Sequence, residues 1–421
     1  MEEQLARHAT RPKQCNYLHW KGKQISHMNF HEYAEELGTP FWDFHRANLH
    51  LELLNRAQEL GATLEVKCRV ADIEYETAED GRTIAVAVLE NGDKRKADLI
   101  VGADGINSRC REILLGRPDP PVLTGDLAYR LLLNTEDMMK DPELRPFIEN
   151  PQVNYWMGPD AHAGMCLNPQ QSPFTDHLVN YVLRGGKQFN MVLLVPDDIP
   201  PGQNVAPGNV EEMCALFQDW DPRIPKLLAL CDSVSKWRLC IRPNLNPTWS
   251  HSSGAFTILG DAAHATLPYL ASGAGMSLED GHVLGLCLGR LSGKSDAEKK
   301  KALKVYERCR RERTEKVVAR GNLQQHLYHV HDGPEQEARD RLLKQFSGFN
   351  GLGRPASEEE LAEKGLEDNS DPFPWRWHGV GKWLLPYECE PDVERRWMEV
   401  ESEAGSLGSR RRQSGEVRAQ L

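Results

Sequence analysis

Hydrophobic positions along the chain follow two different spacings, which predict a mixture of helices and strands. Between residues 45 and 60 the apolar positions fall on one face of a helix, and Gly61 follows; they are Leu49, Leu53, Leu54, Ala57 and Leu60. This spacing predicts an amphipathic helix that ends at the glycine. Strand-like runs surround the helix, including a hairpin over 17–26, alternating runs at 64–70 and 83–89, and a short apolar run at 99–101. The apolar run is typical of a buried parallel strand.

From residue 118 to about 250 the pattern changes to strand-like runs separated by proline and glycine, at 127–133, 153–157, 177–183 and 190–195. A short apolar strand returns at 255–259, a long helix begins near Met276, and a charged amphipathic helix covers 296–320. We therefore expect an α/β fold of mixed α+β character, in which a β-rich domain is inserted into a doubly wound domain.

This pattern divides the chain into five expected parts. Residues 1–117 and 251–330 form the two halves of the doubly wound domain, and residues 118–250 form the inserted β-rich domain. Residues 331–387, which include an aromatic-rich stretch, are expected to pack on the body of the protein. Residues 388–421 are highly charged and are expected to form a disordered tail.

Composition narrows the class of function. The chain has 421 residues and a formal net charge of −11, which argues against nucleic acid as a main partner. No apolar run reaches the length of about 18 residues that a membrane span needs, and residues 1–13 lack the apolar core of a secretory signal. Ten scattered cysteines without a Cys-x-x-Cys pair fit the reduced thiols of a cytoplasmic protein.

The most informative stretch comes directly after the strand at 255–259. It reads Gly-Asp-Ala-Ala-His-Ala-Thr-Leu-Pro over 260–268 and closes with Ser-Gly-Ala-Gly-Met over 272–276. An acidic residue, Asp261, thus follows a strand, and glycines open a helix. The free N–H groups and the positive pole of such a helix suit an anionic or carbonyl-rich ligand. Glycines also allow a flat ring to approach the backbone.

Two further stretches carry candidate chemistry. After the strand at 99–101, residues 104–111 read Asp-Gly-Ile-Asn-Ser-Arg-Cys-Arg. The predicted helix at 45–60 begins with the sequence Phe-His-Arg-Ala-Asn-Leu-His over 44–50. Each stretch taken alone is also compatible with an ordinary turn or with a surface arginine. The stretches support a shared binding function only because they occur together in one chain.

Together these stretches resemble the FAD-dependent aromatic hydroxylases of the salicylate hydroxylase type, which are single-component flavoprotein monooxygenases. The resemblance implies that Asp261 hydrogen-bonds the ribityl chain of FAD. It implies that the backbone N–H groups of Gly273, Ala274 and Gly275 face the pyrimidine side of the flavin ring, and that Pro268 shapes the loop beside its reactive edge. The doubly wound domain is then an FAD-binding domain.

The same resemblance assigns roles to two other residues. Asp104 belongs to an Asp-Gly-x-x-Ser-x-x-Arg motif that braces the FAD pyrophosphate region and contributes to binding of reduced nicotinamide. Arg46 corresponds to an arginine that contacts the FAD phosphates.

The reaction implied uses NADH or NADPH to reduce FAD, adds O2 to form a flavin C4a-hydroperoxide, and transfers one oxygen atom to the substrate. The substrate class implied is an aromatic or a polyketide or terpenoid compound, and hydroxylation and epoxidation both remain open.

The substrate is expected against the β-rich domain, where two residues are candidates for contacting it. Arg130 lies on a predicted strand and suits pairing with a phenolate or carboxylate, although an arginine on the solvent side of a strand is an equal alternative. Tyr155, on the predicted strand 153–157, suits donating a hydrogen bond to substrate, and its alternative is plain packing. His264 is left without a proton-transfer role.

One part of the family pattern is missing from the sequence. The family begins with a strand, a Gly-x-Gly-x-x-Gly turn and a helix, but residues 1–14 contain no glycine, and the match begins near residue 15 with a later segment. Two interpretations are open. Either the functional enzyme is longer than this chain, or the chain is a truncated, catalytically inactive relative that acts as a binding protein or is a non-functional fragment.

Overall fold

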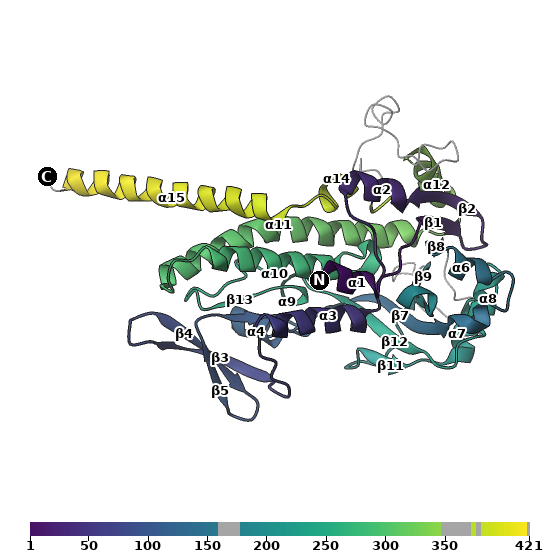
Figure 1. Ribbon diagram of the computed structural model, residues 1–421, viewed down its shortest axis with the longest axis horizontal. Helices are drawn as coiled ribbons and strands as arrows, with labels where there is room; N and C mark the ends of the chain where they lie inside the picture. Colours follow the sequence, from purple (N-terminus) through teal and green to yellow (C-terminus); the bar gives the residue numbers. More distant parts are fainter. Residues whose placement is uncertain (159–176, 347–371, 376–379, 419–421) are drawn as a thin grey trace. The chain divides into compact units, whose positions relative to one another are not determined.

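The structure is a computed structural model that describes residues 1–158, 177–346, 372–375 and 380–418, and the chain forms two units (Figure 1). Unit 1 comprises Met1–Leu64, Leu123–Leu239 and Leu323–Pro386. Unit 2 comprises Glu65–Val122, Cys240–Asn322 and Tyr387–Leu421. Residues 1–64, which were expected in the doubly wound domain, belong here to the same unit as the β-rich segment.

The centre of unit 1 is an eight-stranded mixed sheet with the strand order β11-β12-β7-β10-β9-β8-β1-β2. Strands β1 (Gln14–His19) and β2 (Gln24–Asn29) form the predicted hairpin, and β1 pairs in parallel with β8 (Val153–Met157). This pairing is what places the N-terminal segment in unit 1. The remaining strands are β7 (Val122–Asn134), β9 (His177–Leu183), β10 (Gln188–Pro196), β11 (Val205–Pro207) and β12 (Ser235–Ile241).

One face of this sheet forms the core of unit 1. Side chains alternate between the two faces of a strand, and Leu131, Trp156 and Phe189 point to the face that is buried against short helices. Phe147 on α6 and Leu227 on α8 pack into the same cluster. Full burial of a side chain such as Phe189 stabilises the unit by about 1.5–3 kcal/mol. The helices on this face are α5 (Thr135–Met138), α6 (Arg145–Glu149), α7 (Val210–Leu216) and α8 (Arg223–Leu228).

The other helices of unit 1 include the predicted helix at 45–60. It is confirmed as α3 (Arg46–Glu59), although its apolar stripe is only half-buried, since none of its residues is fully buried. The described part of the expected packing segment contributes the buried Phe373 and Trp375, whereas residues 347–371 and 376–379 lie outside the described residues. Four further helices are α1 (Glu2–Ala6), α2 (Phe30–Leu37), α12 (Pro334–Phe346) and α14 (Gly381–Leu384).

Unit 2 contains two sheets. Strands β6 (Ile100–Gly102) and β13 (Phe256–Ile258) pair in parallel, which confirms the predicted strands at 99–101 and 255–259. An antiparallel sheet joins β3 (Val70–Thr77), β4 (Thr83–Leu89) and β5 (Lys94–Ala97). The predicted strand at 64–70 is wrong, because β3 begins only at Val70. Lys67 has a positive φ of 59°, which is incompatible with a continuous extended strand.

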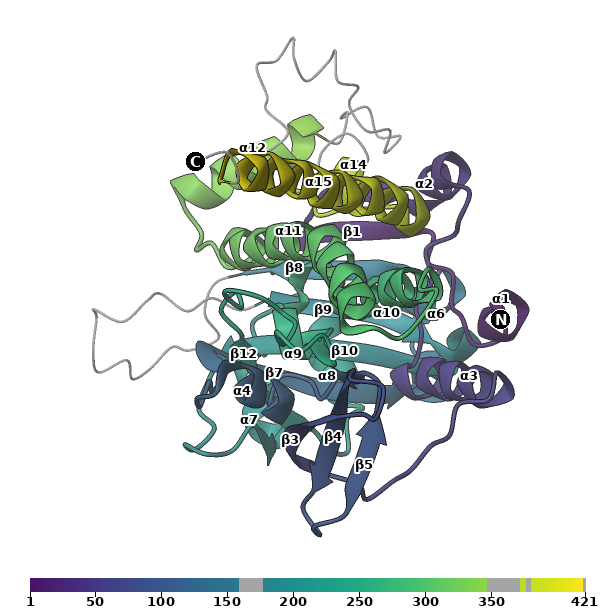
Figure 2. The same ribbon diagram turned by 90° about the vertical axis from the view of Figure 1, so that its left-hand side faces the viewer.

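Three helices run side by side in unit 2: α10 (Gly273–Gly289), the first part of α11 (Asp296–Tyr328) and α15 (Cys389–Arg418) (Figures 1 and 2). Residues 388–421 were expected to form a disordered tail, but Cys389–Arg418 form α15, and residues 419–421 lie outside the described residues. Its residues Val393, Trp397 and Val400 are buried at helical spacing in the core of unit 2. Charge alone suggested disorder, but the acidic Glu403 pairs with Arg308 of α11 at 2.7 Å. Unit 2 also contains α4 (Arg109–Leu115) and α9 (Asp261–His264).

Candidate active site

The first predicted motif forms a tight turn between β13 and α9. Gly260 has a φ of 60°, and a Cβ atom there would lie 3.0 Å from the hydroxyl of Ser277, so a larger residue is disfavoured both by conformation and by space. Asp261 follows as the first residue of α9 and is exposed. Its carboxylate makes no hydrogen bond or ion pair with the described residues, so its accepting capacity is available to a ligand.

The second half of this motif forms the N-terminus of α10. Pro268 is exposed and opens a 3-10 turn over Pro268–Leu270, and the helix follows at Gly273. Counting from the start of α10, Met276 is the first residue whose backbone N–H has an acceptor. It donates to the carbonyl of Ser272 at 2.8 Å.

The preceding N–H groups, of Gly273, Ala274 and Gly275, have no acceptor in the described part of the chain, as expected for a helix start. Ala274 and Gly275 are exposed, and a Cβ atom at Gly275 would meet nothing within 4 Å. The positive pole of a 17-residue helix is therefore open to a ligand.

A buried charged network, which the sequence analysis missed, lies beneath this motif. The carboxylate of Asp280 is fully buried and accepts the N–H of Gly260 at 2.8 Å. Nε2 of His264 lies 2.6 Å from the same oxygen, and Nε of Arg310 donates to the other oxygen at 2.7 Å. Asp280 thus links the turn before α9 to α10 and α11.

The electrostatics of this network are those of a stabilised carboxylate. Burial opposes ionisation of Asp280, but the hydrogen bond from His264 and the positive charges of His264 and Arg310 hold its pKa below its usual range. A sequence signal for the network existed. Asp280 falls between Met276 and Val283 on the buried stripe of an otherwise apolar helix, where a carboxylate needs a cationic partner.

The Asp-Gly motif at 104–111 caps its own helix. The hydroxyl of Ser108 donates to Asp104 at 2.5 Å, and the backbone N–H of Cys110 donates to the second carboxylate oxygen at 2.9 Å. Both oxygens of Asp104 are therefore engaged in holding the turn, although the residue is exposed. A direct contact between Asp104 and FAD or nicotinamide stays a prediction, and the contacts seen here are those of a turn-bracing residue.

Arg111, the last residue of that motif, joins the two motifs of unit 2. Its side chain is buried and donates to the carboxylate of Asp119 at 2.7 Å, to the carbonyl of Ala263 at 2.9 Å and to the carbonyl of Pro243 at 2.7 Å. A planar guanidinium is suited to this fork of acceptors. The contact with Ala263 holds the end of α9 beside α4, which fixes the position of the turn that carries Asp261.

The two candidate substrate residues lie in unit 1, on the same face of the eight-stranded sheet. Strand pairing places Arg130 opposite Val192, Val192 opposite Val179, and Val179 opposite Tyr155. These four residues form one row across the sheet, which we call the substrate row. The row crosses three strand spacings of about 4.8 Å, so the Cα atoms of its two ends lie about 14 Å apart. This is the face opposite to the core formed by Leu131 and Phe189.

The two ends of the substrate row differ in character. Tyr155 is buried, and its ring stacks on Tyr17 with centroids 5.5 Å apart. Burial, followed by the neighbouring Tyr328, raises the pKa of Tyr155 well above its usual value. Its hydroxyl makes no hydrogen bond within the described ranges. The structure therefore shows that the Tyr155 ring packs in the protein, whereas a hydrogen bond from Tyr155 to the substrate stays a prediction.

Arg130 is exposed, and its guanidinium lies over the ring of Trp237 at 5.1 Å from the centroid. Surrounding protein atoms, and then the positive charge of Arg46, lower the pKa of Arg130. Arg46 is exposed at the first turn of α3, beside the positive pole of that helix. Neither arginine has a carboxylate partner among the residues that the structure describes. Two unpaired cations near a helix N-terminus are unfavourable unless an anion joins them.

The residues of unit 2 fit the flavin part of FAD. An exposed carboxylate without a partner suits the hydroxyl groups of a ribityl chain, and a row of free N–H groups without side-chain obstruction suits the carbonyl edge of a flat ring. Gly260 and the buried Asp280 hold these elements in place.

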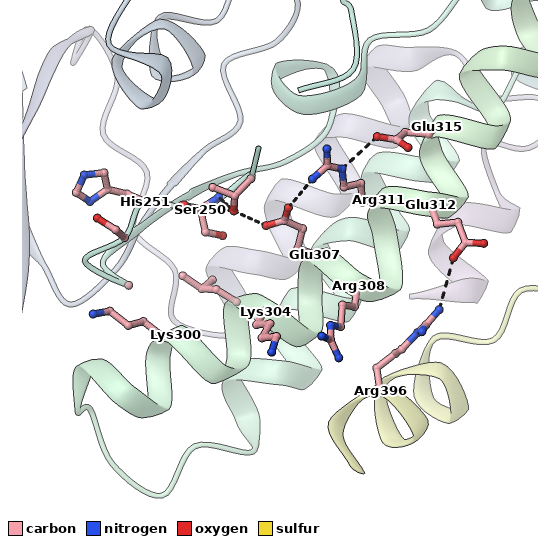
Figure 3. Close-up of a pocket in the computed structure, with 14 residues that line it drawn as sticks. Ser250, His251, Lys300, Lys304, Glu307, Arg308, Arg311, Glu312, Glu315 and Arg396 are labelled. Atoms are coloured by element: carbon pink, nitrogen blue, oxygen red, sulfur yellow. Dashed lines mark hydrogen bonds and ion pairs between the residues drawn. The ribbon is translucent and has the colours of Figure 1, made fainter. Parts of the chain in front are cut away.

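A pocket of about 680 Å³ in unit 2 lies elsewhere, between residues 248–254, α11 and Arg396 of α15 (Figure 3). Its charged side chains largely pair with one another, as Arg311 does with Glu307 and Glu315. None of the predicted site residues lines this pocket. It therefore does not form part of the candidate active site.

Comparison with known proteins shows the class to which this fold and these motifs belong. No protein-family model matches the chain. It is 41% identical to FAD-dependent monooxygenase OpS4 of Beauveria bassiana over 308 residues. This aligned region covers 72% of this chain and 66% of that protein. It is 33% identical over 307 residues to 3-hydroxybenzoate 6-hydroxylase 2 of Aquipseudomonas alcaligenes, which covers 73% of this chain and 85% of that protein.

Solved structures agree on the fold. The chain superposes on a salicylate hydroxylase substrate complex with a TM-score of 0.69 and 22% identity, over 94% of this chain and 85% of the other. The comparison with CtdE in complex with FAD and substrate gives a TM-score of 0.71 at 19% identity. It covers 96% of this chain and 85% of CtdE. The chain belongs to the family of FAD-dependent monooxygenases that includes the 3-hydroxybenzoate 6-hydroxylases. This confirms both the predicted mixed α/β fold and the predicted family. Within the described residues, no helix has the length and apolarity to cross a membrane.

Proposed function

We propose that this protein is an FAD-dependent monooxygenase that uses NAD(P)H and O2 to hydroxylate a small aromatic compound carrying a negative charge. Membership of the family supports an oxidoreductase that uses FAD, since the relatives bear the names of monooxygenases and hydroxylases. The residues implied in flavin binding by the motifs that the chain does contain are all present, and Asp261, Ala274 and Gly275 are exposed, which favours an active enzyme over an inactive relative.

The residues of unit 2 account for how the flavin is held. Asp261 would accept hydrogen bonds from the ribityl hydroxyls, and the N–H groups of Gly273, Ala274 and Gly275 would donate to the carbonyl edge of the flavin ring. These donors and the positive helix pole would favour negative charge on that ring. Arg46 would neutralise a phosphate of the cofactor. When bound and reduced by NAD(P)H, FAD supplies the activation of O2, and the chain's own residues position the substrate and exclude water.

The substrate row is the observation that carries the substrate class. Val179 and Val192 form a half-buried apolar floor between Arg130 and Tyr155, and the ends of the row are about 14 Å apart by strand spacing. One aromatic ring with a charged substituent is shorter than the row and covers the part of it next to Arg130. The guanidinium of Arg130 pairs with a carboxylate or phenolate, and the ring lies on the valines, with its far edge toward Tyr155.

The decisive experiment has two stages. The purified 421-residue chain is mixed with FAD, unbound cofactor is removed, and the absorbance spectrum is recorded. We expect retained flavin bands, and then oxidation of NADH or NADPH that 3-hydroxybenzoate or salicylate stimulates, with a hydroxylated product. A colourless protein would contradict flavin binding by this chain. Retained flavin with no stimulation by any benzoate would contradict the substrate class. Analysis of the product also separates hydroxylation from epoxidation.

A further inference from the structure

The pocket shown in Figure 3 has two ends that differ in how their charges are paired. At one end Arg311 pairs with Glu307 at 3.2 Å, so these two charges offset each other. The other end is lined by His251 and Ser252 of the loop before β13 and by Lys300 of α11. We call these three residues the donor cluster. Each carries a hydrogen-bond donor, and none forms an ion pair with a carboxylate in the part of the chain that the structure describes.

His251 is fixed in the loop before β13. Its ring stacks on that of Tyr75, with centroids 4.2 Å apart and an angle of 9° between the planes. Its Nδ1 accepts the backbone N–H of Ser253 at 3.2 Å, which assigns the proton of the neutral ring to Nε2. Nε2 has no hydrogen-bond partner among the described residues. Its N–H group is therefore a fixed donor, and its acceptor has to come from a ligand or from water.

Lys300 is held by close packing of its stem rather than by an ion pair. A Cβ atom at Gly254 would lie 2.8 Å from Cγ of Lys300, so the lysine stem packs directly against the backbone of the loop. Gly254 also closes the turn of the loop, because its N–H donates to the carbonyl of His251 at 3.0 Å. The carboxylate of Asp296, one helical turn before Lys300, accepts instead from the hydroxyl of Thr83 at 2.6 Å. Nζ of Lys300 therefore has no acceptor within the described ranges.

The charges at this end of the pocket favour an anion. Burial, and then the positive charge of Lys300, lower the pKa of His251, because a protonated imidazole there would face a second cation. Lys304, one helical turn beyond Lys300, adds a positive charge that Glu403 partly offsets at 2.9 Å. An anion bound between the loop and α11 would reduce the repulsion among these groups and supply the acceptors that they lack.

The number of donors and the size of the pocket indicate the kind of anion. A phosphate monoester carries three strong acceptor oxygens and a charge of about −1.5 to −2 at pH 7, so one oxygen is available for each member of the donor cluster. The pocket has a volume of about 680 Å³, which lies within the range of about 300–1,000 Å³ of small-molecule sites. It therefore has room for an organic group attached to the phosphate.

We propose that this pocket binds a phosphate group, either free or carried by a small organic molecule, through the donor cluster. Lys300 supplies the charge, and His251 and Ser252 supply neutral donors. The loop is bridged to β13 at Ser250 and Thr257, so a ligand that joins the loop to α11 stabilises unit 2 against unfolding. The site shares no lining residue with the flavin motif, and the proposal does not rest on the proposed function.

The test is calorimetric titration of the full chain with inorganic phosphate, adenosine 5′-monophosphate and adenosine, at an ionic strength kept constant with sodium chloride. We expect saturable binding of phosphate and a melting temperature that rises with its concentration. Lys300→Gln should weaken this binding at least about fivefold, because a charge-assisted hydrogen bond is lost. Lys300→Arg, which keeps the charge, should bind phosphate within about threefold of the wild-type Kd.

The matched control is Lys301→Gln, which removes the same charge from the neighbouring residue of α11, where Lys301 pairs with Glu401 of α15. It should leave the Kd of phosphate unchanged. Lys300 and Ser252 are both exposed, so Lys300→Gln and Ser252→Ala should fold as the wild type does, and Ser252→Ala should weaken phosphate binding severalfold.

The three probes separate the possible ligands. Tighter binding of adenosine 5′-monophosphate than of phosphate would identify an organic phosphate as the ligand, and equal or weaker binding would identify free phosphate. Equal binding of adenosine and its monophosphate, or no binding of phosphate, would overturn the proposal. Phosphate binding that Lys300→Gln does not weaken, or that Lys301→Gln weakens equally, would also overturn it, because the phosphate would then bind elsewhere on the chain. None of these measurements depends on flavin binding or turnover.

Discussion

The buried carboxylate of Asp280 provides the most demanding test of how unit 2 holds its flavin motif. Three groups contact it: the N–H of Gly260 at 2.8 Å, Nε2 of His264 at 2.6 Å and Nε of Arg310 at 2.7 Å. We therefore take Asp280→Asn as the perturbation, because it removes the charge while keeping the shape of the side chain. The substitution leaves the buried Arg310 with one ionic partner fewer.

The expected magnitude follows from these contacts. Breaking a buried ion pair by removing one partner costs about 3–5 kcal/mol, because the remaining charge stays desolvated. Arg310 keeps its contact with Glu279 at 2.7 Å. We therefore expect a loss near the lower end, about 3 kcal/mol. The N–H of Gly260 also loses its acceptor charge, so the turn that carries Asp261 should shift and FAD affinity should fall at least tenfold.

The assay is urea unfolding of both proteins at pH 7, together with FAD titration. The matched control is Asp261→Asn, an exposed carboxylate without a described partner. It should reduce FAD affinity and leave the free energy of unfolding within about 0.5 kcal/mol. A stability loss below about 1 kcal/mol for Asp280→Asn would refute the assignment of a charge-paired network.

The pH dependence gives a further check on the same residue. The pKa of Asp280 is lowered in the folded state, despite burial, by the hydrogen bond and charge of His264 and by the charge of Arg310. Its contribution is therefore fully present above the unfolded pKa of about 3.9 and is lost as the pH falls through the folded value. The stability difference between wild type and Asp280→Asn should be constant from about pH 5.5 to 7.5 and shrink below about pH 4.

The remaining predictions concern both units. Arg130→Ala should leave FAD binding unchanged and weaken binding of a benzoate at least tenfold, measured by flavin absorbance. Loss of FAD from this variant would contradict a role of Arg130 in binding the substrate. Tyr155→Phe should keep the melting temperature, because the hydroxyl has no described partner, and raise the Kd of 3-hydroxybenzoate severalfold; an unchanged Kd would leave packing as its only role. Because the folded pKa of Asp43, about 8, is raised, its ionisation destabilises the fold as the pH rises from about 4 to 8. Asp43→Asn should therefore melt higher relative to wild type at pH 8.5 than at pH 4.5, and equal differences would argue against burial of an ionisable group. Trp397→Ala on α15 should destabilise the protein by about 3 kcal/mol in urea unfolding, as buried aromatic truncations do; a change below about 0.5 kcal/mol would mean that the helix does not pack.

Several features of this protein were determined by the sequence alone, because their causes are local. The alternation of side chains placed the strands at 83–89, 153–157 and 177–183 at the observed bounds. The motif around Asp261 was recognisable because its residues are contiguous in the chain, from Gly260, which takes a positive φ, to the glycines that open α10. The family followed from these local patterns, as the comparison with known monooxygenases confirms.

Other features depend on which segments come together in space, and local patterns do not contain that information. The charge of residues 388–421 suggested disorder, yet α15 is ordered where Trp397 is buried and where Glu403 pairs with Arg308. The pairing of Asp280 with Arg310 joins helices whose residues are 30 positions apart. Its members looked like separate charges in the sequence.

The candidate substrate face shows the same division. The sequence singled out Arg130 and Tyr155 by residue type, but only the order of strands β7, β10, β9 and β8 places them in one row over two valines. Asp43 gave no signal in the sequence, because an aspartate before a helix is normally solvated. Its backbone forms a bridge with Thr10, its carboxyl group is buried, and desolvation raises its pKa. Residue type and local spacing set what each side chain is able to do, while strand pairing and burial decide which side chains act together.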